Sequence, residues 1–458
     1  MPGPAPSLLR QEIGATLRLA GPLAAANLLQ MMVYAIDVIF VARLGPEALA
    51  ASSLSVALFG LIAWSLSGLT GAVAPLIAAE LGHRTHALRE IRRSVRMALW
   101  LAIASGLVGM AVCLLGEPLM LLTGQSPAVA ARAGAFLHVL MFALIPMIAS
   151  NVLRTFVSAL GRPIFATAIT ALAILVNAVG NWVFVFGHLG APALGLQGSA
   201  LSSGLTSLAT LAAYVLAIRA DPHLSRYHVF GRIWRPDWAR AAAILRIGLP
   251  IAATIVAEAG LFSGASFLMG RIGEAQLAGH TVAFQAAAFA FQVPFGVGQA
   301  ATIRVGYHYG AGDRAGIARA GQVALATGIG FMALSATAMA LAAPLIVAVY
   351  VDTANPANAR MIAFALQFMM VAAAFQLFDG MQVVAAGILR GLQDTRVPMA
   401  IALFAYWVPG AAASIGLGLF TPLAGLGVWL GLLVSLVVAA ALLLWRWHRR
   451  AALGLLPA

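Results

Sequence analysis

The chain has no lysine, a single cysteine and few charged residues of any kind. Without lysine, no nucleotide-binding loop of the form GxxxxGK[ST] is possible, which excludes ATP-driven transport by this chain alone. The single cysteine, Cys113, lies within an apolar run and permits no internal disulfide. Charged residues make up 9% of the 458 residues, against about 25% in ordinary globular chains, so a soluble globular protein is excluded.

Apolar residues dominate what is present. They form 62% of the chain, and the mean hydropathy is +0.96, which predicts an all-α polytopic membrane protein. The net charge of +13 comes entirely from arginine. No basic cluster with interleaved aromatic residues stands on a soluble segment, so we expect no nucleic-acid partner. Cytoplasmic loops and anionic lipid headgroups account for the arginines instead.

The apolar residues fall into twelve stretches, each near the ~20 residues that cross a hydrocarbon core. Each must be helical, because backbone polar groups in lipid need partners within their own segment. The amino terminus lacks the pattern of a cleaved secretory signal, so we expect the first stretch to be retained. The stretches lie at residues 16–41, 48–78, 95–115, 129–152, 164–187, 196–218, 245–269, 277–305, 322–349, 359–388, 398–419 and 424–446.

Arginine is unevenly distributed between the two sets of connecting loops. Residues 79–96 and 219–243 each carry five arginines, and further ones follow the eighth, tenth and twelfth stretches, whereas the alternate loops carry very few. Because positive loops stay in the cytoplasm, we expect both termini to be cytoplasmic.

The chain contains an internal repeat at a constant offset of 228 residues. It pairs Pro22 with Pro250, Arg43-Leu44-Gly45 with Arg271-Ile272-Gly273, Gly68 with Gly296, and Gly82 with Gly310. Six stretches on each side of the polar central segment give both halves the same orientation. We predict two pseudo-symmetric six-helix bundles around a central cleft, at residues 1–220 and 244–458, joined by a cytoplasmic linker at 221–243.

Three carboxylates, Asp37, Glu258 and Asp379, lie inside apolar stretches. A charge at the bilayer centre costs roughly 2.5 to 3.5 kcal/mol on insertion scales, which makes each acid a candidate functional residue. They indicate cation handling inside a transporter.

In the first half, Asn27, Gln30, Tyr34 and Asp37 recur at helical spacing and form one polar stripe. Further polar residues lie on the fifth and sixth stretches, at Asn177, Asn181, Ser199 and Ser202. Carboxylate, amide and hydroxyl oxygens suit a proton or a hard cation such as Na⁺. Such a cluster is also typical of polar contacts that only hold helices together.

In the second half, Glu258 lies at the repeat position of Gln30, and Thr254 precedes it by one turn. Asp379 is flanked by Gln376 and Gln382, while Gln285, Gln292 and Gln299 repeat every seven residues. These residues predict a second polar interior surface, with Na⁺ possible either there or at Asp37. We expect the substrate cavity to be lined by Gln30, Tyr34, Thr254, Phe262, Gln285, Gln292, Phe375 and Gln376, although aromatic stripes in apolar helices are also typical of packing.

Four segments together resemble the multidrug and toxic compound extrusion family, in its NorM-like bacterial branch, over essentially the whole chain. They are GPLAAANLLQMMVYAIDVIFVARLGPEALAASSLS, LVNAVGNWVFVFGHLGAPALGLQGSALSS, GLPIAATIVAEAGLFSGASFLMGRIGEAQLAGH and LFDGMQVVAAGILRGLQDTRVPM. The resemblance implies a bacterial inner-membrane transporter with a proton or sodium site at Asp37, Asn177, Asn181 and Ser199, and a second cation site at Glu258 and Asp379. Relatives of this branch often carry tyrosine where this chain has Phe375.

From the acids we expect secondary active antiport, in which a proton, Na⁺ or a lipophilic organic cation competes for the same carboxylates. We expect no cofactor beyond the coupling ion, cationic drugs or dyes as substrates, and a monomer. Two alternatives remain: a lipid-linked oligosaccharide flippase of the same superfamily, which would need arginine inside its cavity, and a polytopic membrane enzyme, for which we find no catalytic constellation.

Overall fold

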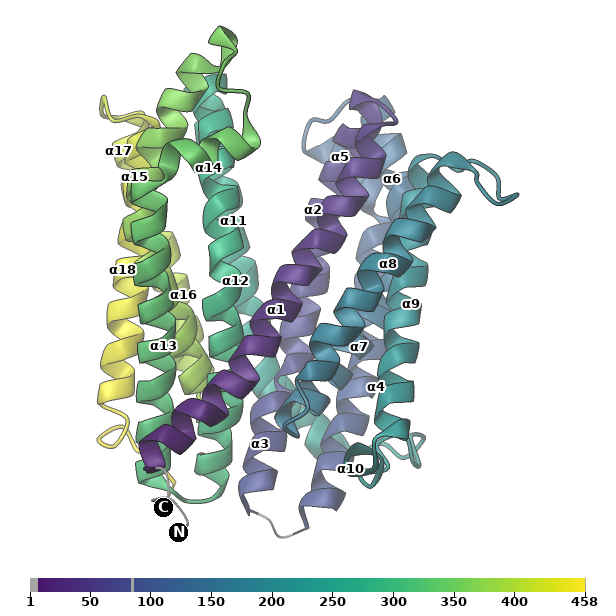
Figure 1. Cartoon of the computed structure of the whole chain (residues 1–458), viewed down its shortest axis with the longest axis vertical. Coiled ribbons are helices and arrows are strands. Elements are labelled where there is room, and N and C mark those ends of the chain that lie inside the picture. The colour runs from purple at the N-terminus through teal and green to yellow at the C-terminus, as the bar shows by residue number, and fades with distance from the viewer. Residues whose placement is uncertain (1–6, 84–85, 458) are drawn as a thin grey trace, which may run out of the picture. The chain divides into compact units, whose positions relative to one another are not determined.

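The computed structural model describes residues 7–83 and 86–457, and every regular element within these ranges is a helix (Figure 1). Twelve membrane-spanning segments lie among them, as predicted. The first six are α1 (Leu8–Ala42), α2 (Pro46–Gly71) with α3 (Val73–His83), α4 (Ala87–Leu114), α6 (Pro127–Leu140) with η1 (Met141–Ala143) and α7 (Leu144–Ala159), α8 (Ile164–Phe186) and α9 (Leu196–Ala220).

The second six follow the central connection in the same order. They are α11 (Trp238–Ile272), α12 (Glu274–Gly310), α13 (Arg314–Leu341), η2 (Pro356–Asn358) with α15 (Ala359–Gly391), α16 (Arg396–Ala405) with η3 (Tyr406–Gly410) and α17 (Ala411–Leu419), and α18 (Gly425–His448). Three short helices complete the list: α5 (Gly116–Leu122), α10 (Pro222–Ser225) and α14 (Ala343–Tyr350).

Proline determines where several helices are interrupted, because it lacks an N–H and its ring clashes with the preceding turn. The ninth predicted stretch, 322–349, is in fact two helices, since α13 ends at Leu341 and α14 starts afresh with Pro344 in its first turn. In the eleventh, Pro409 lies in one π-helical turn, η3, which replaces the continuous α-helix predicted over 398–419.

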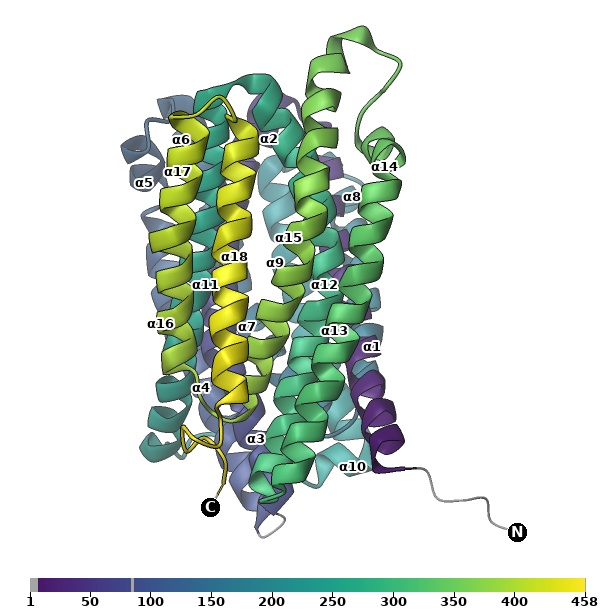
Figure 2. The ribbon, with the colours of Figure 1, turned by 90° about the vertical axis from the view of Figure 1, so that its left-hand side faces the viewer.

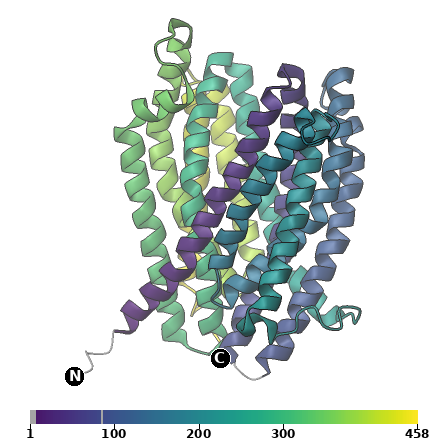
Figure 3. The same cartoon turned by 45° about the vertical axis from the view of Figure 1, so that its right-hand side comes forward.

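Contacts group the chain into two compact units. The N-terminal unit comprises residues Ala25–Ile255, and its best-packed pair is α8 with α9 (Figure 3). In it α7 also packs against α4 and α9, and α2 packs against α6. This unit holds Asp37.

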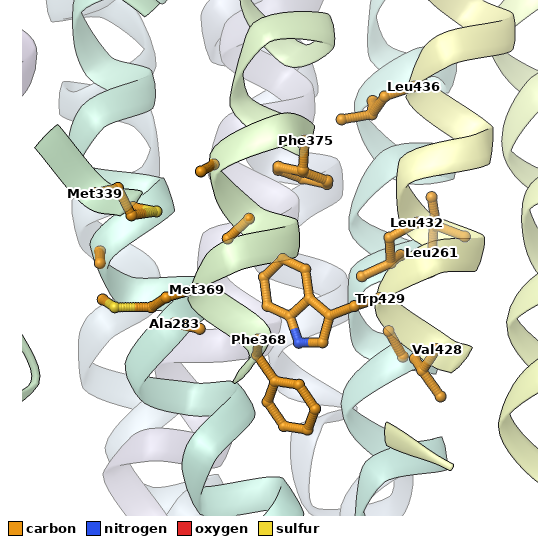
Figure 4. Packing of buried hydrophobic residues seen from close by; sticks show 14 of the residues in the cluster. Leu261, Ala283, Met339, Phe368, Met369, Phe375, Val428, Trp429, Leu432 and Leu436 are labelled. Carbon is orange, nitrogen blue, oxygen red and sulfur yellow. The ribbon is translucent and has the colours of Figure 1, made fainter. Parts of the chain in front are cut away.

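The C-terminal unit comprises the chain up to Ala24 together with Val256–Ala458. Helix α12 packs against α15 and α13, and α18 packs against α15 and α17 (Figure 2). Its apolar core surrounds Trp429, which is fully buried and lies between Phe368 and Phe375 (Figure 4). Glu258 and Asp379 belong to this unit.

The units differ from the predicted domains at two helices. The predicted boundaries at 220 and 244 follow the sequence repeat, whereas the contacts divide α1 after Ala24 and α11 after Ile255. The first segment of α1 thus belongs to the C-terminal unit, and the first segment of α11 belongs to the N-terminal unit.

Candidate cation sites

The carboxylate of Asp37 accepts three hydrogen bonds from two neighbouring helices. The side-chain amides of Asn177 and Asn181 on α8 donate to Oδ1 at 3.0 and 2.8 Å, and the hydroxyl of Ser203 on α9 donates to Oδ2 at 3.0 Å. Both asparagines are 0% exposed. The structure therefore brings two of the three residues predicted around Asp37, the asparagines, into contact with its carboxylate.

The serine of this site was not predicted. Ser199 is buried, but the hydroxyl that contacts Asp37 belongs to Ser203, one turn later on the same face of α9. Ser202 lies behind the asparagines, where its hydroxyl donates to the backbone oxygen of Asn177 at 3.0 Å and accepts from Asn181 at 3.3 Å. The four-residue spacing from Ser199 to Ser203 is the sequence signal that identifies this residue.

These donors explain how a carboxylate is tolerated within an apolar helix. Hydrogen bonds to a charged acceptor are each worth about 1.5 to 3 kcal/mol, which offsets much of the cost of removing Asp37 from water. The side-chain oxygen of Asn181 has no hydrogen-bond partner among the described residues, although it is buried. The NH₂ group of Asn181, not this oxygen, faces Asp37, so the amide has to turn before the oxygen can contact a cation at the carboxylate.

The rest of the α1 stripe is polar as well. The Tyr34 hydroxyl contacts Gln30 and Trp64 by hydrogen bonds, and it interacts electrostatically with Asp37 one turn away. Two turns before Tyr34 on α1, the side-chain oxygen of Asn27 accepts a hydrogen bond from Arg154 of α7 at 2.5 Å. The predicted stripe therefore faces protein partners along its length.

The other two acids form a separate site in the C-terminal unit. Asp379 on α15 and Glu258 on α11 interact electrostatically, and both also interact with the hydroxyl of Tyr406. Gln382 donates to that hydroxyl at 2.6 Å. The Oδ1 atom of Asp379 and the Oε1 atom of Gln382 are buried without a hydrogen-bond partner in the described part of the chain.

Tyr406 was missed because nothing in its immediate sequence marks it as polar. It is the first residue of the π-helical turn η3, which ends at Gly410. Single π-helical turns are rare and frequent at functional sites. Pro409, three residues later in the same turn, is the local sequence signal. The turn sets a phenolic oxygen within electrostatic range of two carboxylates.

The departure at Phe375 has a structural reason. Its ring is 2% exposed and packs against Trp429, with ring centroids 5.6 Å apart (Figure 4). Phe262, also predicted to line the cavity, packs against Phe284 and Phe375 at 5.2 and 6.1 Å. A phenylalanine is the apolar residue that this core requires, while the hydroxyl beside the acids comes from Tyr406.

The other predicted cavity residues are dispersed. Gln376 is fully buried and accepts from Ser335 at 2.8 Å, and Gln292 donates to the backbone oxygen of Ala288. Gln285 is exposed. Thr254 lies in the N-terminal unit, where its hydroxyl donates to the backbone oxygen of Pro250 at 2.9 Å.

Comparison with known proteins identifies the family. The MatE family profile matches twice, at residues 22–183 and 250–414, and the two matches start at Pro22 and Pro250, the first predicted pair of the repeat. A probable multidrug resistance protein NorM of Mesorhizobium japonicum is 45% identical and aligns over 97% of this chain and 95% of its own. Another, of Brucella suis, is 41% identical over 96% and 94%.

Solved structures agree with this assignment at the level of the fold. The crystal structure of the eukaryotic MATE transporter AtDTX14 covers 96% of both chains with a TM-score of 0.87 at 19% identity. These matches confirm the resemblance inferred from the sequence, and they exclude the alternative of a membrane enzyme. The chain belongs to the MatE family, the MATE transporters.

Proposed function

We propose that this protein is a multidrug efflux transporter that exports lipophilic organic cations in exchange for protons or Na⁺. The observation that supports the exchange most directly is the pair of polar sites, each holding buried oxygen atoms without a donor inside an otherwise apolar unit. The relatives named as multidrug resistance proteins support the efflux.

At the Asp37 site the present contacts suit an ionised carboxylate. A proton on Oδ2 requires only that the Ser203 hydroxyl rotate and accept instead of donate, because a hydroxyl can do both. A Na⁺ ion requires more, since an asparagine must turn its oxygen toward the metal in place of its NH₂ group. The geometry thus admits a proton with the smaller rearrangement.

At the Glu258 and Asp379 site two carboxylates share one buried region. Like charges in such a place are costly, so one cation relieves the repulsion as well as the loss of hydration. Either the coupling ion or a cationic substrate meets this need. Competition between the two for the same carboxylates is the exchange that we propose.

The proposal places the protein in the bacterial inner membrane as a monomer with both termini in the cytoplasm. The arginine-rich connections support this orientation. The chain carries few arginines inside its spans, and one of them, Arg154, is already engaged with Asn27. This argues for cationic rather than anionic cargo, since an anionic lipid-linked sugar would require free positive charge.

Transport by purified protein in liposomes tests the proposal. An ethidium-type cationic dye should be moved against its gradient when a proton or Na⁺ gradient is imposed in the opposite direction. Asp37→Asn and Asp379→Asn should each abolish gradient-driven movement. The control is Glu47→Gln, which changes an exposed acid paired with Arg132 at the surface and should leave transport intact.

Two outcomes would contradict the proposal. Normal dye movement by both asparagine variants would show that the buried acids do not couple transport. Movement of a lipid-linked oligosaccharide, with no ion-dependent movement of dye, would favour the flippase.

A further inference from the structure

The two acid-bearing helices α1 and α11 are each divided between the two units. Helix α1 belongs to the C-terminal unit up to Ala24, and its remainder, with Asp37, belongs to the N-terminal unit. Helix α11 divides in the opposite sense: it belongs to the N-terminal unit up to Ile255, and its remainder, with Glu258, belongs to the C-terminal unit. Each helix therefore begins in one unit and carries its acid in the other.

The first segment of α1 is held by a buried ion-pair network, here called the α1 clamp. Glu12 is 4% exposed and accepts two hydrogen bonds from Arg304 of α12, at 2.8 and 2.7 Å. His308, one turn later on α12, contacts Glu12 at 3.1 Å and Asp313 at 3.1 Å. The α1 clamp lies entirely within the C-terminal unit.

The first segment of α11 is held by a second network, the α11 clamp. Both terminal nitrogens of Arg240 donate to Oε1 of Glu80 on α3 at 3.1 Å, and Arg240 also pairs with Glu90 on α4. Arg93 joins Glu90 at 2.9 Å and Asp237 at 2.5 Å. All of these residues belong to the N-terminal unit.

The two clamps occupy equivalent positions of the repeat. At the offset of 228 residues, Glu12 corresponds to Arg240, and Glu80 corresponds to His308. The repeat thus keeps the contact and reverses its acidic and basic partners. Arg304 corresponds to Leu76, which carries no charge. In the α11 clamp the additional partner of Arg240 is Glu90.

Close packing accompanies each clamp at a glycine that the repeat also pairs. A Cβ atom on Gly296 of α12 would lie 2.7 Å from the backbone nitrogen of Ala24, and one on Gly68 of α2 would lie 2.5 Å from Cδ1 of Ile255. Both contacts fall at the point where a helix leaves one unit, within a few residues of Pro22 or Pro250. Both halves of the repeat therefore have an ion-pair network that holds the first helix segment and a close helix contact at a glycine.

From this we propose that Glu12 and Arg240 are positioning residues of the transport cycle. They anchor the first segments of α1 and α11 permanently, so that the conformational change is confined to the segments beyond Pro22 and Pro250 that carry Asp37 and Glu258. The inference rests on the proposed transport function. It distinguishes an anchor, which stays closed throughout the cycle, from a gate, which must open.

Cross-linking separates the anchor from a gate. In a Cys113→Ala background, the variant Glu12→Cys/His308→Cys loses the α1 clamp and should transport dye several-fold more slowly while binding dye as tightly as the wild type. Joining the two thiols with a short bifunctional reagent should restore the rate. Loss of the remaining transport on cross-linking would overturn the proposal, because it would show that the contact has to open.

A charge exchange provides a second test that does not depend on cysteine. Glu12→Arg alone should impair turnover, and the triple variant Glu12→Arg/Arg304→Leu/His308→Glu, which copies the α11 clamp, should recover much of it. A triple variant no faster than the single variant would contradict the equivalence. Arg10→Gln is the matched control, since it removes an exposed charge from the same turn.

Dye transport by the wild type and by Glu12→Gln distinguishes a failure of the proposed transport function from a failure of the anchor proposal. A wild type that moves no dye would overturn the proposed function and this inference with it. An active wild type whose Glu12→Gln variant is equally fast would overturn the inference alone.

Discussion

Replacing Asn181 with leucine tests how the Asp37 site controls its ion. The side-chain amide of Asn181, which is fully buried, donates to Oδ1 of Asp37 at 2.8 Å. Leucine has the same number and branching of non-hydrogen side-chain atoms but no donor. The ionised carboxylate loses one charged hydrogen bond, whereas the form neutralised by a proton depends on it less.

The magnitude follows from that one bond. A hydrogen bond to a charged group contributes about 1.5 to 3 kcal/mol. Since 1.36 kcal/mol corresponds to a tenfold change in an equilibrium, the occupied form should be favoured about 10- to 150-fold more than in the wild type. The coupling ion should bind more tightly and leave more slowly.

Dye movement in liposomes, driven by a proton gradient and measured as a function of proton concentration, tests this expectation. The ion concentration that gives half-maximal coupling should fall by at least about tenfold, and the maximal rate should fall because release is slower. The control is Asn151→Leu, which removes a half-buried amide that donates to the backbone oxygen of Ser67 and should leave the ion dependence unchanged. Equal half-maximal concentrations in the Asn181→Leu variant and the wild type would refute the reasoning.

Three further predictions concern other parts of the molecule. Tyr406→Phe removes the hydroxyl beside the second pair of acids and leaves Gln382 without its partner, so ion-driven efflux should fall and the melting temperature should drop; unchanged efflux would remove Tyr406 from the site. Gly296→Ala should lower the melting temperature in detergent because its Cβ would meet the Ala24 backbone, whereas Gly60→Ala, which meets nothing within 4 Å, should not lower it. The backbone N–H of Gly316 at the start of α13 holds the pKa of Asp313 below its usual 3.8, helped by nearby cations. Asp313 therefore contributes stability above about pH 4 that is lost as pH falls, and the melting temperatures of the wild type and Asp313→Asn should differ at pH 7 and converge on acidification.

The division of α1 and α11 gives the two candidate sites a common design. Each site places its acid on the second segment of a helix whose first segment is fastened in the other unit. Neutralising Asp37 or Glu258 changes the electrostatics of one segment only, because the fastened segment keeps its own ion pairs. This arrangement explains why the repeat retains proline near each point of division.

The sequence by itself determined the class of protein, the twelve spans, the repeat and the family. The class and the spans follow from local physics: an apolar run of about 20 residues is stable across the hydrocarbon core only when its backbone forms a helix. It also identified Asp37, Asn177 and Asn181 correctly as neighbours, because helical spacing places the two asparagines on one face and a carboxylate in lipid needs donors.

Only the tertiary structure decided which atoms meet across helices. Ser203 rather than Ser199 reaches Asp37 because the rotation of α9 about its axis depends on packing against α8, which no local pattern specifies. Tyr406 reaches the second pair of acids through a π-helical turn, and Phe375 is committed to the core around Trp429. The division of α1 and α11 between the units is likewise invisible in the sequence, since it depends on where Glu12 and Arg240 find partners nearly 300 and 160 residues away along the chain.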